Sequence, residues 1–289
     1  MKKSRLRFWL FLAPALISFS LVVIIPTLIG FFYSFTDWNG IVGNHVKFVG
    51  FRNFITIFTR DDSFLKAFEF TALFAVCAVM LVNITGFALA LFVTQKRKGA
   101  TFLRGTFFMP NLIGGLLLGF TWQFIFTSVF DEIFKKTGWA FFSGWLSDQA
   151  TGFLGLLILT VWQLSGYMMV IYIAQIQQIP EEVKEAARID GATFWPMLKN
   201  ITLPLMMPAF TIGIFLSISN SFKMFDQNLA LTQGGPYKST EMLALNIYNS
   251  AFGSNEFGLA QAKSIVFLIV VAAIGVTQLV LTKRKEVEM

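Results

Sequence analysis

Cysteine, histidine and charged residues are scarce in this 289-residue sequence. Cys77 is the only cysteine and His45 the only histidine. The chain therefore cannot form an internal disulfide or a two-cysteine redox motif, and it lacks the cysteine and histidine ligands of a zinc site. Only 13% of the residues are charged, whereas 55% are hydrophobic and the mean hydropathy is +0.66. Soluble domains carry about 25% charged residues. The composition therefore indicates a membrane protein.

The long apolar stretches have no acidic or basic side chain in their interior. Lys66 and Glu69 lie at the start of one stretch, and Lys263 lies just before another. Transporters driven by protons or sodium usually hold ionisable groups inside the membrane, where charge is costly and is kept for function. Proteolysis within the membrane would need a Ser–His pair or paired aspartates, which are missing too. We therefore expect no catalytic, metal-binding or cofactor-binding residue in this chain, and an energy source outside it.

Six apolar runs are long enough to cross a membrane. A helix needs about 20 apolar residues to span the hydrocarbon core, and backbone groups in lipid must be paired internally, which favours helices. The alternating ten-residue pattern of a membrane barrel is missing. We predict an all-α integral membrane protein with a single transmembrane domain over residues 1–289. The predicted spans are 9–35, 69–94, 106–128, 152–177, 203–222 and 264–282.

Lysine and arginine are distributed unevenly among the segments that join these spans. If the N-terminus is cytoplasmic, the inner segments hold more than half of the 23 basic residues, among them Lys96, Arg97, Lys98, Arg104 and Lys285. Basic residues near span ends favour the cytoplasmic side. We predict that both termini are cytoplasmic, in the inner membrane of a prokaryote. The net charge of +7 is then a topology signal and no indication of nucleic-acid binding.

A polar segment, residues 179–202, separates the fourth and fifth predicted spans. Pro180 and the two glutamates after it are typical of a helix start, because negative charge stabilises the first turn. Gly191 can end this helix, and Thr193 can cap a second, shorter one. The sequence thus predicts a bent pair of helices between two spans.

One face of the first helix in this segment is small and smooth. Val183, Ala186, Ala187 and Asp190 recur at helical spacing and so share a face. A helix that lies on lipid would instead present a face rich in leucine and phenylalanine. An alanine face favours docking into a groove of another protein.

The same segment resembles a known family. Glu185-Ala186-Ala187, then Gly191 after three residues, then Ile201, Leu203 and Pro204 resemble the EAA loop of binding-protein-dependent ABC transporter permeases. In that family the loop is the cytoplasmic coupling helix, which docks into a separate ATPase subunit, and the fold is a type I permease bundle. The resemblance implies that Glu185 makes a polar contact with the ATPase. Ala186 and Ala187 would allow close approach, Gly191 would set the bend, and Asp190 would belong to the same surface.

A second segment narrows the resemblance. Thr232-Gln233-Gly234-Gly235-Pro236 is similar to the TxGGP turn of the carbohydrate-uptake branch of that family, where it follows the span after the EAA loop. From the residues alone, Gly-Gly-Pro predicts only a tight turn at a helix end.

Gly115 and Gly119 in the third predicted span are spaced to allow close packing against another helix.

Neutral polar and aromatic side chains, which suit sugar recognition, lie in the middle of several spans. Their alternative role is hydrogen bonding between helices. The register of the maltose-type permeases implies six sugar-contact positions, of which Tyr167 and Ser217 keep the family's residue type, whereas Ser221 and Met224 replace amide side chains. Asn220 joins them because of its place in a polar stretch. The candidates for the substrate path are Gln163, Leu164, Tyr167, Ser217, Asn220, Ser221 and Met224.

The resemblance implies a non-catalytic permease subunit of an ATP-driven importer for a sugar or oligosaccharide. Its partners would be a second, related permease, two ABC ATPase subunits that bind ATP and magnesium, an extracytoplasmic sugar-binding protein and the lipid bilayer. An ABC permease for another solute, such as glycerol phosphate, would need a charged side chain in its path. A stand-alone channel or secondary transporter would work without an ATPase.

Overall fold

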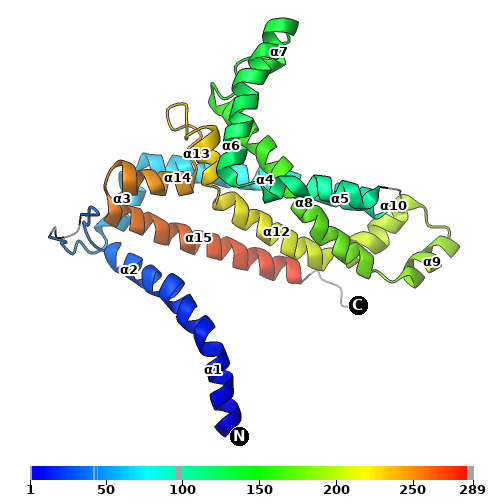
Figure 1. The fold of residues 1–289 in the computed structure, drawn as a ribbon, viewed down its shortest axis with the longest axis horizontal. Coiled ribbons are helices and arrows are strands. Elements are labelled where there is room, and N and C mark those ends of the chain that lie inside the picture. The colour runs from blue at the N-terminus through cyan, green and yellow to red at the C-terminus, as the bar shows by residue number, and fades with distance from the viewer. Residues whose placement is uncertain (1, 42, 44, 96–98, 285–289) are drawn as a thin grey trace. The chain divides into compact units, whose positions relative to one another are not determined.

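The computed structural model is helical over nearly all of its described length (Figure 1). Residues 2–41, 43, 45–95 and 99–284 are described, residues 2–7 by their backbone alone. Four basic residues used in the topology prediction, Lys96, Arg97, Lys98 and Lys285, lie outside the described residues. Within the described part of the chain no strand forms, and a single β-bridge joins Thr36 to Phe48.

Fifteen α-helices follow one another in the described residues. In order they are α1 (Lys2–Phe19), α2 (Ile25–Tyr33), α3 (Arg52–Thr59), α4 (Asp62–Thr94), α5 (Ala100–Phe108), α6 (Gly115–Phe124), α7 (Phe130–Thr137), α8 (Gln149–Gln178), α9 (Glu181–Ile189), α10 (Phe194–Met197), α11 (Leu203–Leu205), α12 (Met207–Phe222), α13 (Asp226–Leu231), α14 (Leu243–Tyr248) and α15 (Phe257–Lys283). Short π-helical turns at Ser20–Ile24, Ile125–Val129 and Leu198–Thr202 continue the helix from one of these elements to the next.

In the part of the chain that the structure describes, five helices are long and apolar enough to cross a membrane, and a bent pair raises the number to six. The five are Phe8–Tyr33, Asp62–Thr94, Gly115–Thr137, Gln149–Gln178 and Phe257–Lys283. The bent pair consists of Phe194–Leu205 and Met207–Phe222, which meet at 68°. The prediction of an all-α membrane fold with six spans is confirmed, because each apolar run of the sequence contributes one of these helices.

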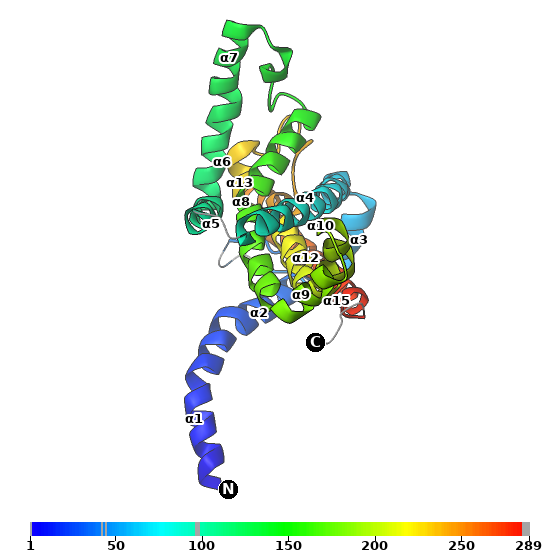
Figure 2. The ribbon, with the colours of Figure 1, turned by 90° about the vertical axis from the view of Figure 1, so that its right-hand side faces the viewer.

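The third span differs most from its predicted limits of 106–128. Residues up to Phe108 belong to the separate helix α5, and a 3₁₀ turn over Met109–Leu112 follows. Ile113 and Gly114 are extended, and α6 begins at Gly115. Pro110 cannot donate to a preceding turn, and the extended pair then breaks the helix completely. The span instead runs on through α7 to Thr137, so that α6 and α7 form one long rod (Figure 2).

The chain divides into two compact units. The larger unit contains residues 66–246 and 270–289. Its central element is α8, which packs against α5, α6, α12 and α13 and buries side chains along its whole length. Asp148 caps the start of α8 by accepting the Thr151 N–H at 2.8 Å.

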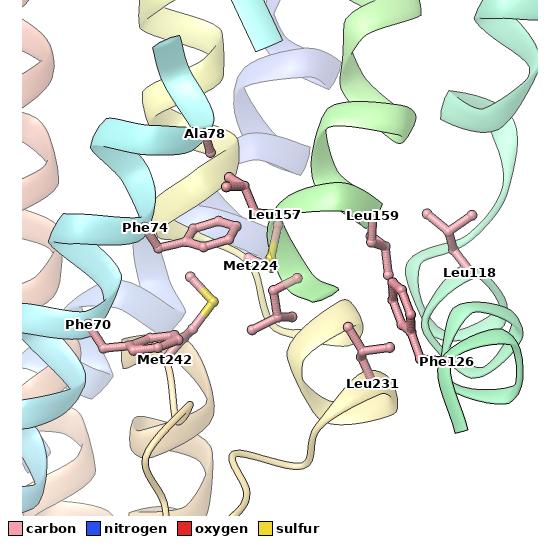
Figure 3. Close-up of a cluster of buried hydrophobic side chains, with 11 residues drawn as sticks. Phe70, Phe74, Ala78, Leu118, Phe126, Leu157, Leu159, Met224, Leu231 and Met242 are labelled. Atoms are coloured by element: carbon pink, nitrogen blue, oxygen red, sulfur yellow. The ribbon is translucent and has the colours of Figure 1, made fainter. Parts of the chain in front are cut away.

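Two apolar clusters fill this unit at successive levels along α8. The first joins α4, α6, α8 and α13, whose side chains converge in Figure 3, with Phe70 and Phe74 of α4 on one side and Phe126 on the other. The second joins α4, α8 and α12 around Met168 and Tyr172. Because both clusters share α4 and α8, these two helices form the frame of the unit.

Helix α13, which lies between the fifth and sixth predicted spans, packs closely against α6. A Cβ added at Gly115 would lie 2.7 Å from the Asp226 Cβ, and one added at Gly119 would lie 2.5 Å from the Ala230 Cβ. The prediction that this glycine pair serves close packing is therefore confirmed, and the packing is within the chain.

The turn after α13 is held by one buried amide side chain. Asn228 donates to the Thr240 carbonyl at 2.8 Å and accepts the Met242 N–H at 3.0 Å. The tight turn predicted at Gly-Gly-Pro is present, with the Gly235 N–H bonded to the Thr232 carbonyl at 2.8 Å and Gly234 at φ +77°.

The smaller unit contains residues 1–65 and 247–269 and is joined by a buried ion pair. Lys263 lies 2.6 Å from an Asp61 carboxylate oxygen and donates to the Ser250 Oγ at 2.7 Å. We expected Lys263 to precede the last span, but α15 begins at Phe257 and so includes it. Gly258 lets the first turn of α15 lie against the backbone of Thr36, because a Cβ there would lie 2.1 Å from the Thr36 oxygen.

Candidate functional site

The predicted coupling loop forms two short helices in a row. Helix α9 has Pro180 at its N-cap position and Glu181 and Glu182 in its first turn, with Arg188 in its last turn. Both sets of charges oppose the helix dipole and so stabilise the helix. Glu181 also pairs with Lys184 at 3.3 Å and with Arg188 at 3.4 Å, although exposed pairs of this kind contribute little.

Gly191 ends α9 as the sequence predicted. It lies in the left-handed region at φ +81°, which glycine adopts without a steric penalty. Its N–H bonds to the Arg188 carbonyl at 3.0 Å, and the Ala192 N–H bonds to the Ala187 carbonyl at 2.9 Å. This pair of bonds is a Schellman motif, which turns the chain sharply away from the helix axis.

The second helix of the loop begins at Phe194. Thr193 occupies the N-cap position in extended conformation, but its side chain makes no capping hydrogen bond, so the predicted Thr193 cap is wrong in that respect. The first turn is closed by the backbone alone, through the bond from Met197 N–H to the Thr193 carbonyl at 3.1 Å. From here the helix runs on to Leu205 and joins α12 at the 68° bend.

The surface of the loop is more apolar than the alanine pattern predicted. Glu185 and Ala186 are exposed and Ala187 is half-buried. Beside them, Ile189 is 86% exposed and Trp195 is 72% exposed. An exposed apolar patch outside the membrane is typical of a surface that contacts another molecule. The sequence carries this signal, since both residues lie in a mostly polar segment.

Two glutamines meet where α8 passes the start of α6. Gln227 on α13 donates to the Gln163 Oε1 at 2.9 Å, and the Gln163 amide donates to the Ile113 carbonyl at 3.5 Å. Ile113 is the extended residue at the break of the third span. Gln163 therefore ties α8 both to this break and to α13. Gln227 was missed by sequence analysis because it lies outside the predicted spans.

Ser217 belongs to a buried hydrogen-bond network among three helices. The Tyr172 hydroxyl donates to the Asn83 Oδ1, and the Asn83 amide donates to the Ser217 Oγ at 3.0 Å. Ser217 in turn donates to the Gly213 carbonyl at 2.7 Å. The network links α4, α8 and α12. In this arrangement the polar atoms of Ser217 are occupied by other parts of the chain.

The remaining candidates have different surroundings. Leu164 and Met224 lie in the two apolar clusters, and Tyr167 packs half-buried at the edge of the second. Asn220 is exposed. Ser221 is buried, and its Oγ has no hydrogen-bond partner among the described residues. The structure therefore brings Gln163 into a polar contact and holds Ser217 within its own network. The Asn220 amide donates to the Leu216 carbonyl of its own helix at 2.9 Å.

The polar side chains among the candidate path residues are uncharged and can bind a ligand only through hydrogen bonds. Among the residues that the structure describes, no group of three His, Cys, Asp or Glu side chains could hold a metal ion. The arrangement suits passage and recognition of an uncharged, hydroxyl-rich molecule, for which amide and hydroxyl groups are the usual partners.

Comparison with known proteins decides the family. A family model described as the binding-protein-dependent transport system inner membrane component matches residues 83–286. The chain belongs to this family. The match contains both α9 and every candidate for the substrate path, so the permease resemblance seen in the EAA loop is confirmed.

Relatives of this permease cover its whole length. It is 49% identical to AmyD of Thermoanaerobacterium thermosulfurigenes, a probable starch degradation products transport system permease protein, over 99% of this chain and 97% of that protein. It is 32% identical to MsmF of Streptococcus mutans serotype c, a multiple sugar-binding transport system permease protein, over 96% of each.

A solved structure shows the same fold. The permease matches a chain of a bacterial alginate ABC transporter, in complex with an alginate pentasaccharide-bound periplasmic protein, with a TM-score of 0.82 and 20% identity over 98% of this chain and 96% of that chain. At this identity the likeness concerns the fold alone, and it confirms the ABC importer permease bundle.

Proposed function

We propose that this chain is the permease subunit of an ATP-driven importer for a sugar or oligosaccharide. The end-to-end likeness to AmyD, at 49% identity, is the observation that carries the proposal. The likeness to MsmF, a permease of a multiple-sugar system, supports the same class of substrate. The neutral polar groups of α8 and α12 are consistent with it, since they offer hydrogen bonds and no charge.

The proposed role of α9 is to couple the membrane helices to an ATPase. Glu185 is exposed, and the Ile189 and Trp195 side chains of the same loop are exposed too. Desolvated aromatic and aliphatic anchors contribute most of the energy of protein contacts, whereas rim charges set specificity. We assign Glu185, Ala186, Ala187, Asp190 and Gly191, extended by Ile189 and Trp195, to this contact.

The bend between α11 and α12 gives a route for the coupling. Residues 194–205 form one continuous helical stretch from the loop to the bend. Movement of α9 against the ATPase would therefore be transmitted to the end of α12, which carries Ser217, Asn220 and Ser221. Hydrolysis itself belongs to the ATPase, which would bind ATP and magnesium, and this chain acts as a non-catalytic partner.

The complete importer would contain a second, related permease, two ATPase subunits and an extracytoplasmic sugar-binding protein. The loop at α9 would then face the cytoplasm together with both termini. The excess of basic residues on that side supports this orientation. Gln163, Leu164, Tyr167, Ser217, Asn220, Ser221 and Met224 are the proposed residues of the sugar path.

Two alternatives make different demands on the chain. A permease for a charged solute such as glycerol phosphate would need a cation in the path, whereas the candidate path is lined by neutral groups. A secondary transporter would couple to an ion gradient and would need ionisable groups within the spans. The ion pair of Asp61 with Lys263 lies near the starts of α4 and α15. Neither residue is close in sequence to a candidate path residue.

Uptake into sealed, right-side-out vesicles of native membranes tests the proposal. Labelled malto-oligosaccharide is supplied with the binding protein outside, and ATP is loaded inside. We expect uptake that needs ATP and persists when an ionophore collapses the ion gradients. Uptake that stops with the ionophore and continues without ATP would support the secondary transporter instead.

A further inference from the structure

An apolar groove runs along the larger unit between α4, the end of α5 and α8. It encloses about 870 Å³, which is within the range of about 300–1,000 Å³ usual for ligand pockets. Its walls include Thr85 and Leu89 of α4, Phe107 of α5, and Ile158 and Trp162 of α8, and none of the residues that line it is charged.

The walls of this groove are fixed by close backbone contacts. A Cβ added at Gly166 of α8 would lie 1.8 Å from the Phe107 carbonyl oxygen, so α5 rests directly on α8 at that point. A Cβ added at Gly86 of α4 would lie 2.7 Å from the Met168 Cβ, so α4 and α8 also touch. The groove is therefore part of the packed frame of the unit.

One polar atom is buried in the groove without a partner. Ser165 lines it and is 3% exposed, and among the described residues its Oγ makes no hydrogen bond. An unpaired buried hydroxyl costs free energy. The Oγ has almost no exposed surface, so a ligand acceptor oxygen would reach it, and remove this cost, once the Ser165 side chain rotates toward the groove.

A cation without a carboxylate partner lies at one end of the groove. Arg104 precedes Phe107 by about one turn of α5. Its guanidinium donates to the Val93 carbonyl at 3.2 Å, while its buried Nε has no partner and no ion pair in the described part of the chain includes it. Val93 lies one turn beyond Leu89 on α4. The guanidinium therefore lies about one helical turn beyond the residues that line the groove on α5 and on α4.

We propose that this groove binds an acidic glycerophospholipid of the membrane. An acyl chain fills the apolar part, the phosphate pairs with Arg104, and an ester carbonyl accepts the Ser165 hydroxyl. A guanidinium matches a phosphate in charge and in hydrogen-bond geometry, and hydrocarbon matches walls that lack charge. The proposal depends only on the membrane location of the chain and is independent of its substrate.

Photolabelling of the full-length chain, purified from native membranes with its associated subunits, tests this site. The probe is a phosphatidylglycerol with a diazirine in one acyl chain, and the labelled peptides are mapped. We expect labelling concentrated on residues 81–89 and 154–166. Excess unlabelled phosphatidylglycerol should reduce it about tenfold more than phosphatidylcholine does, because the two lipids differ in the charge that Arg104 would meet.

Matched variants separate the phosphate contact from the acyl contact. Arg104→Gln should abolish the preference for phosphatidylglycerol, Arg104→Lys should retain part of it, and Lys283→Gln, which changes an exposed cation on α15, should leave it intact. Ile158→Phe, within the groove, should reduce labelling of residues 154–166, whereas Leu279→Phe on the exposed side of α15 should not.

Three results would overturn the proposal. Labelling spread evenly over all spans would indicate ordinary boundary lipid. Labelling unchanged by Arg104→Gln would remove the phosphate contact. Labelling of residues 154–166 that occurs only after the associated subunits are stripped away would show that another protein subunit covers the groove.

Discussion

Replacing Asp61 should destabilise the chain more than replacing its partner Lys263. Lys263 is 2% exposed and Asp61 is 14% exposed, and they lie 2.6 Å apart. Asp61→Asn removes the charge that compensates the buried ammonium group. Lys263→Met leaves the carboxylate, which is nearer to solvent and keeps its bonds from the Ser63 hydroxyl at 2.7 Å and the Phe64 N–H at 3.0 Å.

Removal of one member of a buried ion pair costs about 3–5 kcal/mol, because the other charge stays desolvated. We expect Asp61→Asn to lie in that range. For Lys263→Met we expect about 1–3 kcal/mol, since the carboxylate retains hydrogen bonds. The double variant should lose less free energy of unfolding than the two single variants lose together. The difference, which is the interaction free energy of the pair, should be about 1–3 kcal/mol.

Thermal unfolding of the purified chain in detergent, followed by tryptophan fluorescence, measures these differences. With about 2 °C per kcal/mol for a large chain, Asp61→Asn should lower the midpoint by about 6–10 °C. Lys47→Gln, which changes a cation on an exposed residue of the same unit, is the control and should shift it by less than about 1 °C. If the midpoint shift of the double variant equals the sum of the shifts of the two single variants, the reasoning is refuted.

The same pair predicts a dependence on pH. Burial raises the pKa of the Asp61 carboxyl, but hydrogen bonds from Lys263, Ser63 and the Phe64 N–H, together with the charge of Lys263, hold the pKa below its ordinary value of 3.8. A carboxyl with a lowered pKa stabilises the folded state above its unfolded pKa, and this stabilisation is lost as the pH falls through the folded pKa. The Asp61 contribution should therefore be constant above about pH 5 and vanish at lower pH, and Asp61→Asn should lack it.

Three further changes test other parts of the structure. Gly191→Asp changes a residue at φ +81° with open space around the Cβ, so it should cost about 1 kcal/mol of local stability. The amount of chain in the membrane should stay unchanged while uptake falls relative to ATP hydrolysis, and normal uptake would contradict docking. Tyr172→Phe leaves the buried Asn83 acceptor unpaired and should lower stability by about 1–3 kcal/mol in thermal unfolding, whereas an unchanged midpoint would exclude the network. Gly119→Val should push α13 from α6, because a Cβ there would lie 2.5 Å from that of Ala230, and should lower the midpoint of thermal unfolding by several degrees. The control Gly105→Val, at an open position on α5, should shift this midpoint by much less.

The sequence predicted those parts of the fold that depend on local pattern. Apolar runs gave all six spans, because the bilayer demands long apolar helices regardless of what packs against them. Gly191 was predicted to end α9 because only a glycine adopts the left-handed conformation without strain. In both cases the cause lies within a few residues of the effect.

The parts that depend on distant contacts could not be predicted. Tyr172 and Asn83 are 89 residues apart and form their hydrogen bond only once α4 and α8 are packed. Helix α13 is six residues long, too short for a periodic pattern, and is held by its packing on α6. The same packing brings Gln227 to Gln163. Which residues of the candidate path contact a substrate stays a prediction, and the interior place of Leu164 and Met224 makes Gln163, Asn220 and Ser221 the first to test.

Co-purification tests the central proposal most directly. The tagged chain is isolated from native membranes in mild detergent, and ATP hydrolysis is measured with the sugar-binding protein, empty or loaded with oligosaccharide. We expect an ATPase subunit to accompany the chain, hydrolysis to rise when the loaded binding protein is added, and Gly191→Asp to abolish this rise. An intact chain recovered in good yield without an ATPase, or hydrolysis indifferent to the loaded binding protein, would contradict the proposal.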